Sequence, residues 1–202
     1  MRGQPAGGEA PRAVGPADPV VLVLASGRGE RFRASGGQVH KLQARLGPVA
    51  VLEQTLAAVR ASGLPWHLED AGHPGMGDSI AAAVRACAPA AGWLVLPADL
   101  PLVQPETLRR VARALKDHAV VVPVLDTPQG PRGHPVGFAP ACRAALLGLQ
   151  GNQGAAPVVQ GFGATKIIVH DVGIVTDVDT VEDLARAEAL WRERTAGPAA
   201  QA

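Results

Sequence analysis

Two glycines and two cations follow an apolar segment near the start of the chain, in a spacing that suits phosphate binding. Gly27 and Gly29 come just after the apolar residues 20–25, Arg31 follows them, and Lys41 lies beyond a second glycine pair. Closely spaced glycines let the backbone turn sharply and direct N–H groups at an anion. Fixed cations beside such a turn can hold a triphosphate and stabilise its charge. The pattern therefore predicts a phosphate cradle, with an ordinary strand-to-helix turn and solvated arginines as the alternative.

This glycine turn differs from two common nucleotide-binding motifs. Phe32 stands where a dinucleotide-binding GxGxxG motif needs its third glycine. The chain also lacks the GK[ST] end of a Walker A loop at this point. The residues of the turn alone therefore indicate a phosphate without identifying which one.

Two aspartates, Asp99 and Asp179, each follow an apolar run further along the chain. Asp99 lies in a proline-flanked turn directly after residues 92–97, and Asp179 follows residues 174–178. Open α/β sheets bind ligands at the carboxyl ends of their strands, so both carboxylates could reach one edge. Two carboxylates holding Mg²⁺ against nucleotide phosphates would use that geometry. The alternatives are an Asx turn or helix cap for Asp99 and a helix-dipole contact for Asp179.

His134 is the candidate for a substrate contact or an acid–base role. It lies between Gly133 and Pro135 in a loop that follows an apolar run. The alternative is an ordinary loop histidine. A second glycine-rich loop, residues 71–79, opens onto an alanine-rich helix that Asp78 or Ser79 could cap.

Apolar runs and helical patterns alternate along the chain, which predicts a three-layer α/β fold with a mostly parallel sheet. Strands are expected at residues 20–25, 64–68, 92–97, 119–125, 136–139, 166–170 and, as a short extended piece, 174–178. Helices are expected at residues 49–62, 80–90, from 105 to 115, 140–149, a short one within 151–163, and 181–194. Thr180 and Asp183 have the spacing of an N-terminal capping pair for the last of these helices.

Composition limits the class of protein. A length of 202 residues suits one domain, which we expect at residues 19–195, with a disordered extension at 1–18 and a flexible tail at 196–202. The net charge of +1 gives no long-range basic field, so we expect neither a nucleic-acid nor a membrane partner. Two cysteines make neither a disulfide framework nor a zinc site, and we expect both to be buried. With no secretory signal or membrane-length apolar stretch, a cytoplasmic protein is the default.

Five ordered motifs resemble the MobA-like nucleotidyltransferase family, and within it the molybdenum cofactor cytidylyltransferases. They read LASGRGERF with a later Lys, GMGDSI, LPADLPLV, GHPVGF and DVDTVEDL, and they span residues 20–190. The resemblance implies a Rossmann-like fold and Mg²⁺-dependent transfer of a nucleotidyl group from an NTP to an acceptor phosphate, with release of pyrophosphate. It implies as partners an NTP, a phosphorylated small-molecule acceptor and a molybdoenzyme or its chaperone. We expect a monomer or a weak dimer.

The resemblance also implies roles for individual residues. Asp99 and Asp179 would hold the metal, and Arg31, Lys41 and Asp99 would be catalytic. Gly133, His134 and Pro135 would border the acceptor. The nucleotide would contact Ala25, Ser26, Gly27, Gly29, Arg31, Lys41, Gly77, Asp78, Ser79 and Ala98.

The chain departs from the family pattern at three places. The segment between Arg31 and Lys41 is longer than usual, and Ser26 replaces an alanine. Residues 64–74 leave room for one strand where the family has a strand, a helix and a strand. We therefore expect one βα unit to be missing and the remaining strand to lie beside residues 20–25.

The leading hypothesis is transfer of the nucleotidyl group of CTP to molybdopterin. The alternatives are transfer from GTP to molybdopterin, transfer to a sugar phosphate or another small phosphate, and an inactive nucleotide- or cofactor-binding protein that assists molybdoenzyme maturation. The shortened segment motivates the last alternative. The presence of two metal-type carboxylates argues against it, since a simple binding protein has less need of them.

Overall fold

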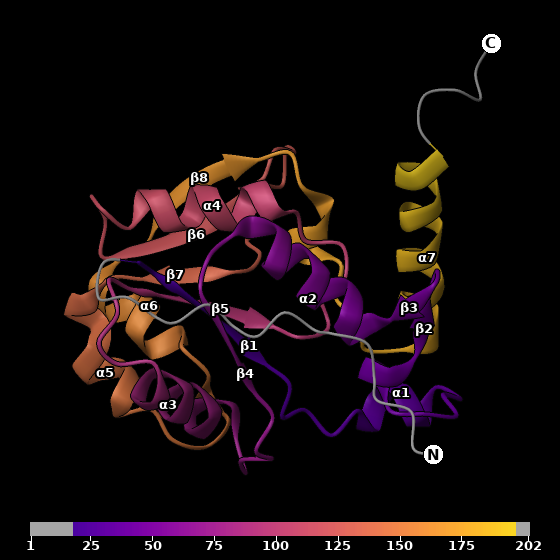
Figure 1. Cartoon of the computed structure of the whole chain (residues 1–202), viewed down its shortest axis with the longest axis horizontal. Coiled ribbons are helices and arrows are strands. Elements are labelled where there is room, and N and C mark those ends of the chain that lie inside the picture. Colours follow the sequence, from indigo (N-terminus) through magenta and orange to yellow (C-terminus); the bar gives the residue numbers. More distant parts are fainter. Residues whose placement is uncertain (1–17, 197–202) are drawn as a thin grey trace, which may run out of the picture.

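The computed structural model describes residues 18–196 and has a six-stranded mixed sheet at its centre (Figure 1). Our expectations for residues 1–17 and 197–202 lie outside the described residues. The strands, in order across the sheet, are β4 (Trp66–Glu69), β1 (Val20–Leu24), β5 (Trp93–Pro97), β7 (Val136–Phe138), β6 (Val120–Leu125) and β8 (Thr165–Val169). β7 pairs antiparallel with both of its neighbours, and the other pairings are parallel. The predicted α/β fold with a mostly parallel sheet is therefore confirmed.

Helices cover both faces of the sheet, which gives three layers. α2 (Val51–Ser62) and α4 (Pro105–Ala114) lie over one face (Figure 1). α3 (Met76–Ala86), α5 (Arg143–Leu147) and α6 (Ala156–Phe162) lie over the other. α1 (Glu30–Ala34), α7 (Val181–Ala196) and the two-stranded ribbon of β2 (Arg45–Leu46) and β3 (Val49–Ala50) lie beside one end of the sheet. None of the described helices has both the length and the apolarity that a bilayer crossing requires.

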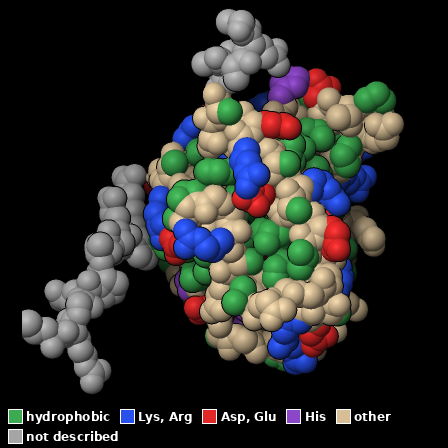
Figure 2. Space-filling view, turned by 90° about the vertical axis from the view of Figure 1, so that its right-hand side faces the viewer, with side chains coloured by type: hydrophobic (Ala, Val, Ile, Leu, Met, Phe, Trp, Pro, Cys, Tyr) green, Lys and Arg blue, Asp and Glu red, His purple; other side chains and the backbone are tan. Residues whose placement is uncertain are grey.

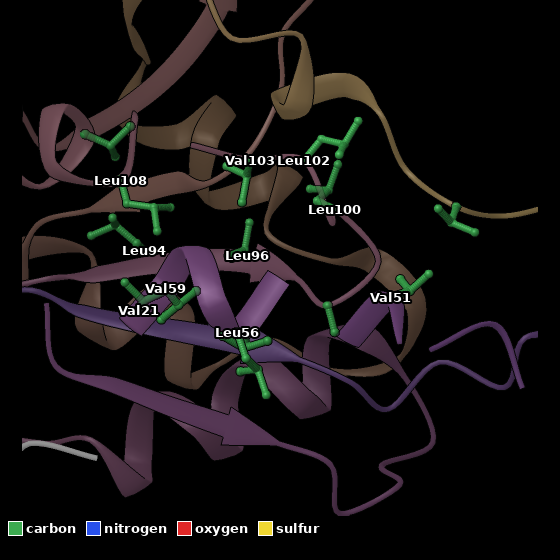
Figure 3. Close-up of a cluster of buried hydrophobic side chains, with 14 of the residues drawn as sticks. Val21, Val51, Leu56, Val59, Leu94, Leu96, Leu100, Leu102, Val103 and Leu108 are labelled. Atoms are coloured by element: carbon green, nitrogen blue, oxygen red, sulfur yellow. The ribbon is translucent and has the colours of Figure 1, made fainter. Parts of the chain in front are cut away.

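β1 is buried on both faces because its alternate side chains enter the two halves of the core. Val21 and Val23 pack in the cluster under α2 and α4, where Val59 and Leu108 also lie (Figure 3). The intervening side chains of β1 pack in the cluster under α3, α5 and α6. An uninterrupted apolar run is thus explained by burial on both faces.

The strand of residues 64–68 was expected beside residues 20–25, and this is confirmed. β4 pairs parallel with β1, with Val21 opposite Trp66 and Leu24 opposite Glu69. β4 forms one edge of the sheet. The short segment between α2 and α3 therefore supplies a single strand.

Three local predictions were wrong. α3 begins at Met76 with Gly75 as its N-cap, so neither Asp78 nor Ser79 caps it. The segment expected to be extended at 174–178 instead includes a 3₁₀ helix, Val172–Val175. A Cβ on Gly173 would lie 2.1 Å from the Leu102 carbonyl oxygen, so this segment packs directly on the neighbouring backbone. Residues 49–50 form the ribbon strand β3 and are not helical.

α7 is anchored at its start by a reciprocal cap, as predicted. The Thr180 N–H donates to Asp183 Oδ2 at 2.9 Å, and the Asp183 N–H donates to Thr180 Oγ1 at 3.1 Å. Further along α7, Trp191 packs under the ribbon at Gly47, where a Cβ would meet the indole at 2.6 Å. Figure 2 shows this side of the molecule, where acidic and basic side chains are interspersed among apolar ones.

Candidate functional site

A cleft of about 970 Å³ opens at the carboxyl edge of the sheet. The ends of β1 and β5 reach this edge. β7 runs in the opposite direction, so the loop before its first residue reaches the same edge. The predicted site residues that line the cleft are Ala25, Ser26, Gly27, Gly29, Arg31, Lys41, Ser79, Asp99, Gly133, His134 and Asp179.

Four predicted residues do not line the cleft. Ala98 is buried in the core, and Pro135 is also buried. Gly77 packs against the backbone of Gln150, since a Cβ on Gly77 would lie 2.8 Å from the Gln150 carbonyl oxygen. Asp78 accepts a hydrogen bond from the Gly151 N–H at 3.0 Å. The predicted roles of these residues in binding remain predictions.

The glycine turn is closed by His40. Gly29 has a φ of 64°, a left-handed conformation that favours glycine, and it begins α1. The His40 ring nitrogen Nε2 lies 2.8 Å from the Gly27 carbonyl oxygen, and a Cβ on Gly29 would approach the same ring at 3.2 Å. The long segment before Lys41 therefore folds back over the turn. Lys41 begins a 3₁₀ helix, Lys41–Gln43, at the cleft wall.

The predicted cations and carboxylates meet in one cluster. Lys41 Nζ donates to Asp99 Oδ2 at 2.5 Å and to Asp179 Oδ1 at 2.6 Å. Arg31 Nη1 donates to Asp179 Oδ2 at 2.6 Å. The backbone holds the two aspartates side by side, because the Val178 N–H donates to the Asp99 carbonyl at 3.0 Å. This geometry agrees with the expectation that Asp99 and Asp179, which are far apart in the sequence, reach the same edge of the sheet.

Lys41 is held in its charged form. Burial would lower the pKa of its ammonium, but the nearby Asp99 and Asp179 carboxylates outweigh burial and raise that pKa above the usual value. Its side chain is only 11% exposed, whereas the paired Arg31 side chain is 80% exposed. Lys41 therefore neutralises the carboxylates inside the cleft, while Arg31 does so at its mouth.

The carboxylates of Asp99 and Asp179 suit a hard divalent cation that also takes ligands from the bound substrate. Asp99 Oδ1 is buried and has no hydrogen-bond partner, so one carboxylate oxygen is available to a cation. Within residues 18–196, no group of three or more His, Cys, Asp and Glu side chains is arranged to hold a metal alone. Mg²⁺ commonly takes one or two carboxylates, with substrate phosphates and water completing its shell. The two aspartates match that arrangement.

His134 is partly buried, and its surroundings favour the neutral imidazole. Burial lowers the pKa of its imidazole, and this effect outweighs a backbone hydrogen bond at Val95 and the charges of Asp99 and Asp177. Its Nδ1 is buried without a hydrogen-bond partner. The preceding Gly133 fits tightly, since a Cβ there would lie 2.3 Å from the Ile174 carbonyl oxygen. His134 can therefore offer a neutral hydrogen-bonding group to a ligand and is poorly suited to donate a proton as an imidazolium.

Sequence reasoning missed several polar residues in the cleft wall. Among them are His73, Arg132, Asn152 and Asp177. His73 lies in the predicted glycine-rich loop of residues 71–79, and Arg132 directly precedes the GHPVGF motif, so their positions carried a signal. Asn152 lies in a short 3₁₀ helix, Gly151–Gln153, whose position at the cleft the sequence does not reveal.

Comparison with known proteins gives a family and a shared fold. A model of the MobA-like NTP transferase domain matches residues 53–167. No curated protein sequence matches the chain. The matched region contains Asp99 and His134, and it begins after the glycine turn and ends before Asp179.

Solved structures resemble the chain over most of its length. Rv0371c from Mycobacterium tuberculosis H37Rv is 22% identical, with a TM-score of 0.71 and coverage of 86% of this chain and 98% of that one. A second structure of Rv0371c is a complex with manganese, at a TM-score of 0.67, 22% identity and coverage of 86% and 98%. A nucleotidyl transferase from Methanothermobacter, Mth528, is 22% identical, with a TM-score of 0.71 and coverage of 88% and 99%.

A 2-C-methyl-D-erythritol 4-phosphate cytidylyltransferase from Thermus thermophilus also has this fold. It is 23% identical, with a TM-score of 0.63 and coverage of 87% of this chain and 99% of that one. At these identities the likenesses show a common fold.

Proposed function

The chain belongs to the MobA-like NTP transferase family and is a nucleotidyltransferase, and we propose that CTP is its favoured donor and molybdopterin its favoured acceptor. In the proposed reaction, an oxygen of the acceptor phosphate attacks the α-phosphorus of the NTP. A new P–O bond forms there as the bond to the β-phosphate breaks, and pyrophosphate leaves. Such transfer depends mainly on positioning and charge neutralisation.

The observation that carries the metal-assisted transfer is the cluster of Lys41, Asp99 and Asp179 beside the glycine turn. The choice of CTP and molybdopterin rests on the resemblance of the five sequence motifs to the molybdenum cofactor cytidylyltransferases. Asp99 and Asp179 would hold Mg²⁺, which when bound neutralises charge on the phosphates. The manganese complex of Rv0371c supports a divalent metal on this fold. Gly27 and Gly29 line the cleft beside Arg31, where backbone N–H groups and a guanidinium suit the triphosphate.

Lys41 has a second role in this proposal. In the structure, its ammonium lies between the carboxylates that would hold the metal. A cation arriving there competes with the ammonium, and the flexible lysine side chain can then turn to the negatively charged phosphates. Lys41 would thus stabilise the carboxylate pair before substrate binds and stabilise the phosphates afterwards.

A second candidate acceptor is a small phosphorylated alcohol. The likeness to the Thermus cytidylyltransferase favours it, since that enzyme acts on 2-C-methyl-D-erythritol 4-phosphate on the same fold. GTP with molybdopterin is a further donor–acceptor pair within the family. The acceptor would approach from the side of Gly133 and His134, which border the cleft.

The proposal extends to the setting of the enzyme. We place it in the cytoplasm, where NTP and Mg²⁺ are available, acting as a monomer or weak dimer. A molybdoenzyme or its chaperone would receive the product.

Pyrophosphate release tests the proposal. The full chain would be incubated with MgCl₂ and each of CTP, GTP, ATP and UTP, with and without molybdopterin or 2-C-methyl-D-erythritol 4-phosphate. We expect release that requires one acceptor and is fastest with CTP. Absence of release with every pair, together with tight metal-independent binding of CTP by calorimetry, would instead support the binding protein.

A further inference from the structure

A buried carboxylate at the end of β4 has no assigned role in the proposed reaction. Glu69 is 7% exposed and its side chain has no lysine or arginine partner among the described residues. Instead, Oε1 accepts a hydrogen bond from the Ala71 N–H at 3.2 Å and lies 3.3 Å from His73 Nε2. Oε2 lies 3.6 Å from His67 Nε2. Burying a carboxylate is costly unless such partners compensate it.

Asp171, the other buried acidic side chain among the described residues, differs because its hydrogen bonds account for its burial. Asp171 accepts hydrogen bonds from the Gln104 N–H, the Thr107 hydroxyl and the Gly173 N–H. These contacts join the start of α4 to the Val172–Val175 helix, and neither Asp171 nor any of these three partners lines the cleft. Glu69 differs, since one of its partners, His73, lines the cleft.

Glu69 connects the glycine turn with the loop that carries His73. Its carbonyl accepts a hydrogen bond from the Ala25 N–H at 2.9 Å and another from the Ser26 hydroxyl at 3.4 Å. Its carboxylate holds the Ala71 N–H and the His73 ring. The residue therefore fixes the wall between the two loops that line this part of the cleft.

We propose that His73 contacts the nucleoside part of the bound NTP and that Glu69 is its positioning residue. The inference rests on the proposed NTP-dependent function. Within the cleft, the residues next to His73 are Pro74, Gly75, Met76 and Ser79, which carry no charge, whereas the cations of the cleft cluster lie near the glycine turn and Asp179. Asp78 and Arg85 share a separate, smaller hollow with His73. An uncharged wall with one polar ring suits a base or ribose better than a triphosphate.

The Glu69 carboxylate also determines which nitrogen of the His73 ring can accept a hydrogen bond from a ligand. A carboxylate beside Nε2 favours the tautomer with its hydrogen on that nitrogen, which leaves the lone pair of Nδ1 as an acceptor. A ribose hydroxyl or a base amino group is the matching donor. His67 contacts the same carboxylate but does not line the cleft, so it provides a matched control.

Calorimetric titration of the full chain with CTP and with GTP, in MgCl₂, tests the proposal. We expect His73→Ala to weaken binding of the preferred nucleotide by about tenfold, the effect of one lost hydrogen bond. His67→Ala should bind like wild type. His73→Asn, whose amide can replace Nδ1, should retain more affinity than His73→Gln. Glu69→Gln should weaken binding by an intermediate factor, and thermal unfolding would establish that the variant is folded.

Inorganic triphosphate separates a nucleoside contact from a phosphate contact. Its affinity should be the same for wild type and His73→Ala, because the proposed contact lies outside the phosphates. Equal loss for triphosphate and for the nucleotide would overturn the assignment to the nucleoside. Equal nucleotide affinity of His73→Ala and His67→Ala would overturn the role of His73 while leaving NTP binding intact. Absence of NTP binding by wild type would overturn both the inference and the proposed function.

Discussion

Lys41 Nζ lies 2.5 Å from Asp99 Oδ2, although the two residues are 58 positions apart in the chain. The same ammonium lies 2.6 Å from Asp179 Oδ1. The Lys41 ammonium therefore lies between two carboxylates that would otherwise repel each other inside the cleft, and Arg31 adds a second positive charge at Asp179. The sequence predicted these groups for one site, and the structure adds that the cation contacts the carboxylates directly.

The first prediction concerns competition between Lys41 and a metal. In Lys41→Met, Mn²⁺ measured by electron paramagnetic resonance without nucleotide should bind several-fold more tightly, because the competing ammonium is gone. With the preferred NTP present, the same variant should bind nucleotide more weakly, since a phosphate contact is lost. Lys116→Met, which removes an exposed lysine after α4, should change neither value. Weaker Mn²⁺ binding by nucleotide-free Lys41→Met would contradict the proposed competition.

The glycine turn gives a matched pair of substitutions. Gly29→Ala should lower the free energy of unfolding by about 1 kcal/mol, because φ is 64° and the new Cβ would approach the His40 ring at 3.2 Å. Gly27→Ala should change stability little, since nothing lies within 4 Å of its Cβ position. Urea denaturation measures both. Equal destabilisation by the two substitutions would contradict the left-handed turn at Gly29.

The cap of α7 predicts a pH-dependent contribution to stability. Burial would raise the pKa of Asp183, but hydrogen bonds from Thr180 and Asp179 and the charge of Arg186 together lower it. A lowered folded-state pKa means that the stabilisation is present above the unfolded value of about 3.9 and is lost as pH falls through the folded value. Asp183→Ala should cost about 1 kcal/mol at pH 7 by urea denaturation. The difference from wild type should shrink in acid; a constant difference down to the lowest pH would contradict the assignment.

Cys87 should be an unreactive thiol in the folded protein. Burial, assisted by the negative charge of Glu69, raises its pKa to about 11. The thiolate is the nucleophile, so iodoacetamide at pH 8 should modify Cys87 far more slowly in native protein than in urea, as measured by mass spectrometry. The sign of the shift also predicts that stability falls as pH rises from about 9 toward 11, because the folded state retains the proton longer. Equal rates of modification in native and unfolded protein would contradict this environment.

Much of the architecture follows from the sequence because burial leaves a simple pattern. The apolar residues 20–25 predicted a central strand, and the lack of room between residues 64 and 74 predicted a single strand beside it. Asp99 could be assigned to the edge of the sheet because it directly follows a buried strand. These inferences need only local patterns and the rule that parallel strands share their carboxyl edge.

The remaining features depend on contacts between distant segments. β2 and β3 have two residues each, too few to show an alternating pattern. The direct pairing of Lys41 with Asp99 depends on how residues 32–40 fold back over the glycine turn, where the His40 ring contacts the Gly27 carbonyl. The approach of Glu69 to His73 likewise depends on the shape of a loop. Sequence patterns specify faces and edges, whereas side-chain partners across loops require the folded chain.

Transfer of the α-phosphorus itself tests the proposed function most directly. The full chain would be incubated with α-³²P-labelled CTP, MgCl₂ and molybdopterin, beside Asp99→Asn and the control Asp117→Asn, whose carboxylate is exposed beyond α4. We predict that label moves to molybdopterin with wild type and Asp117→Asn, and that Asp99→Asn is slower by roughly 100-fold or more, as for loss of one strong electrostatic contact in a transition state. Transfer by Asp99→Asn at the wild-type rate would contradict the proposed role of Asp99. Label that remains in the NTP with every donor and acceptor pair would contradict the proposed function.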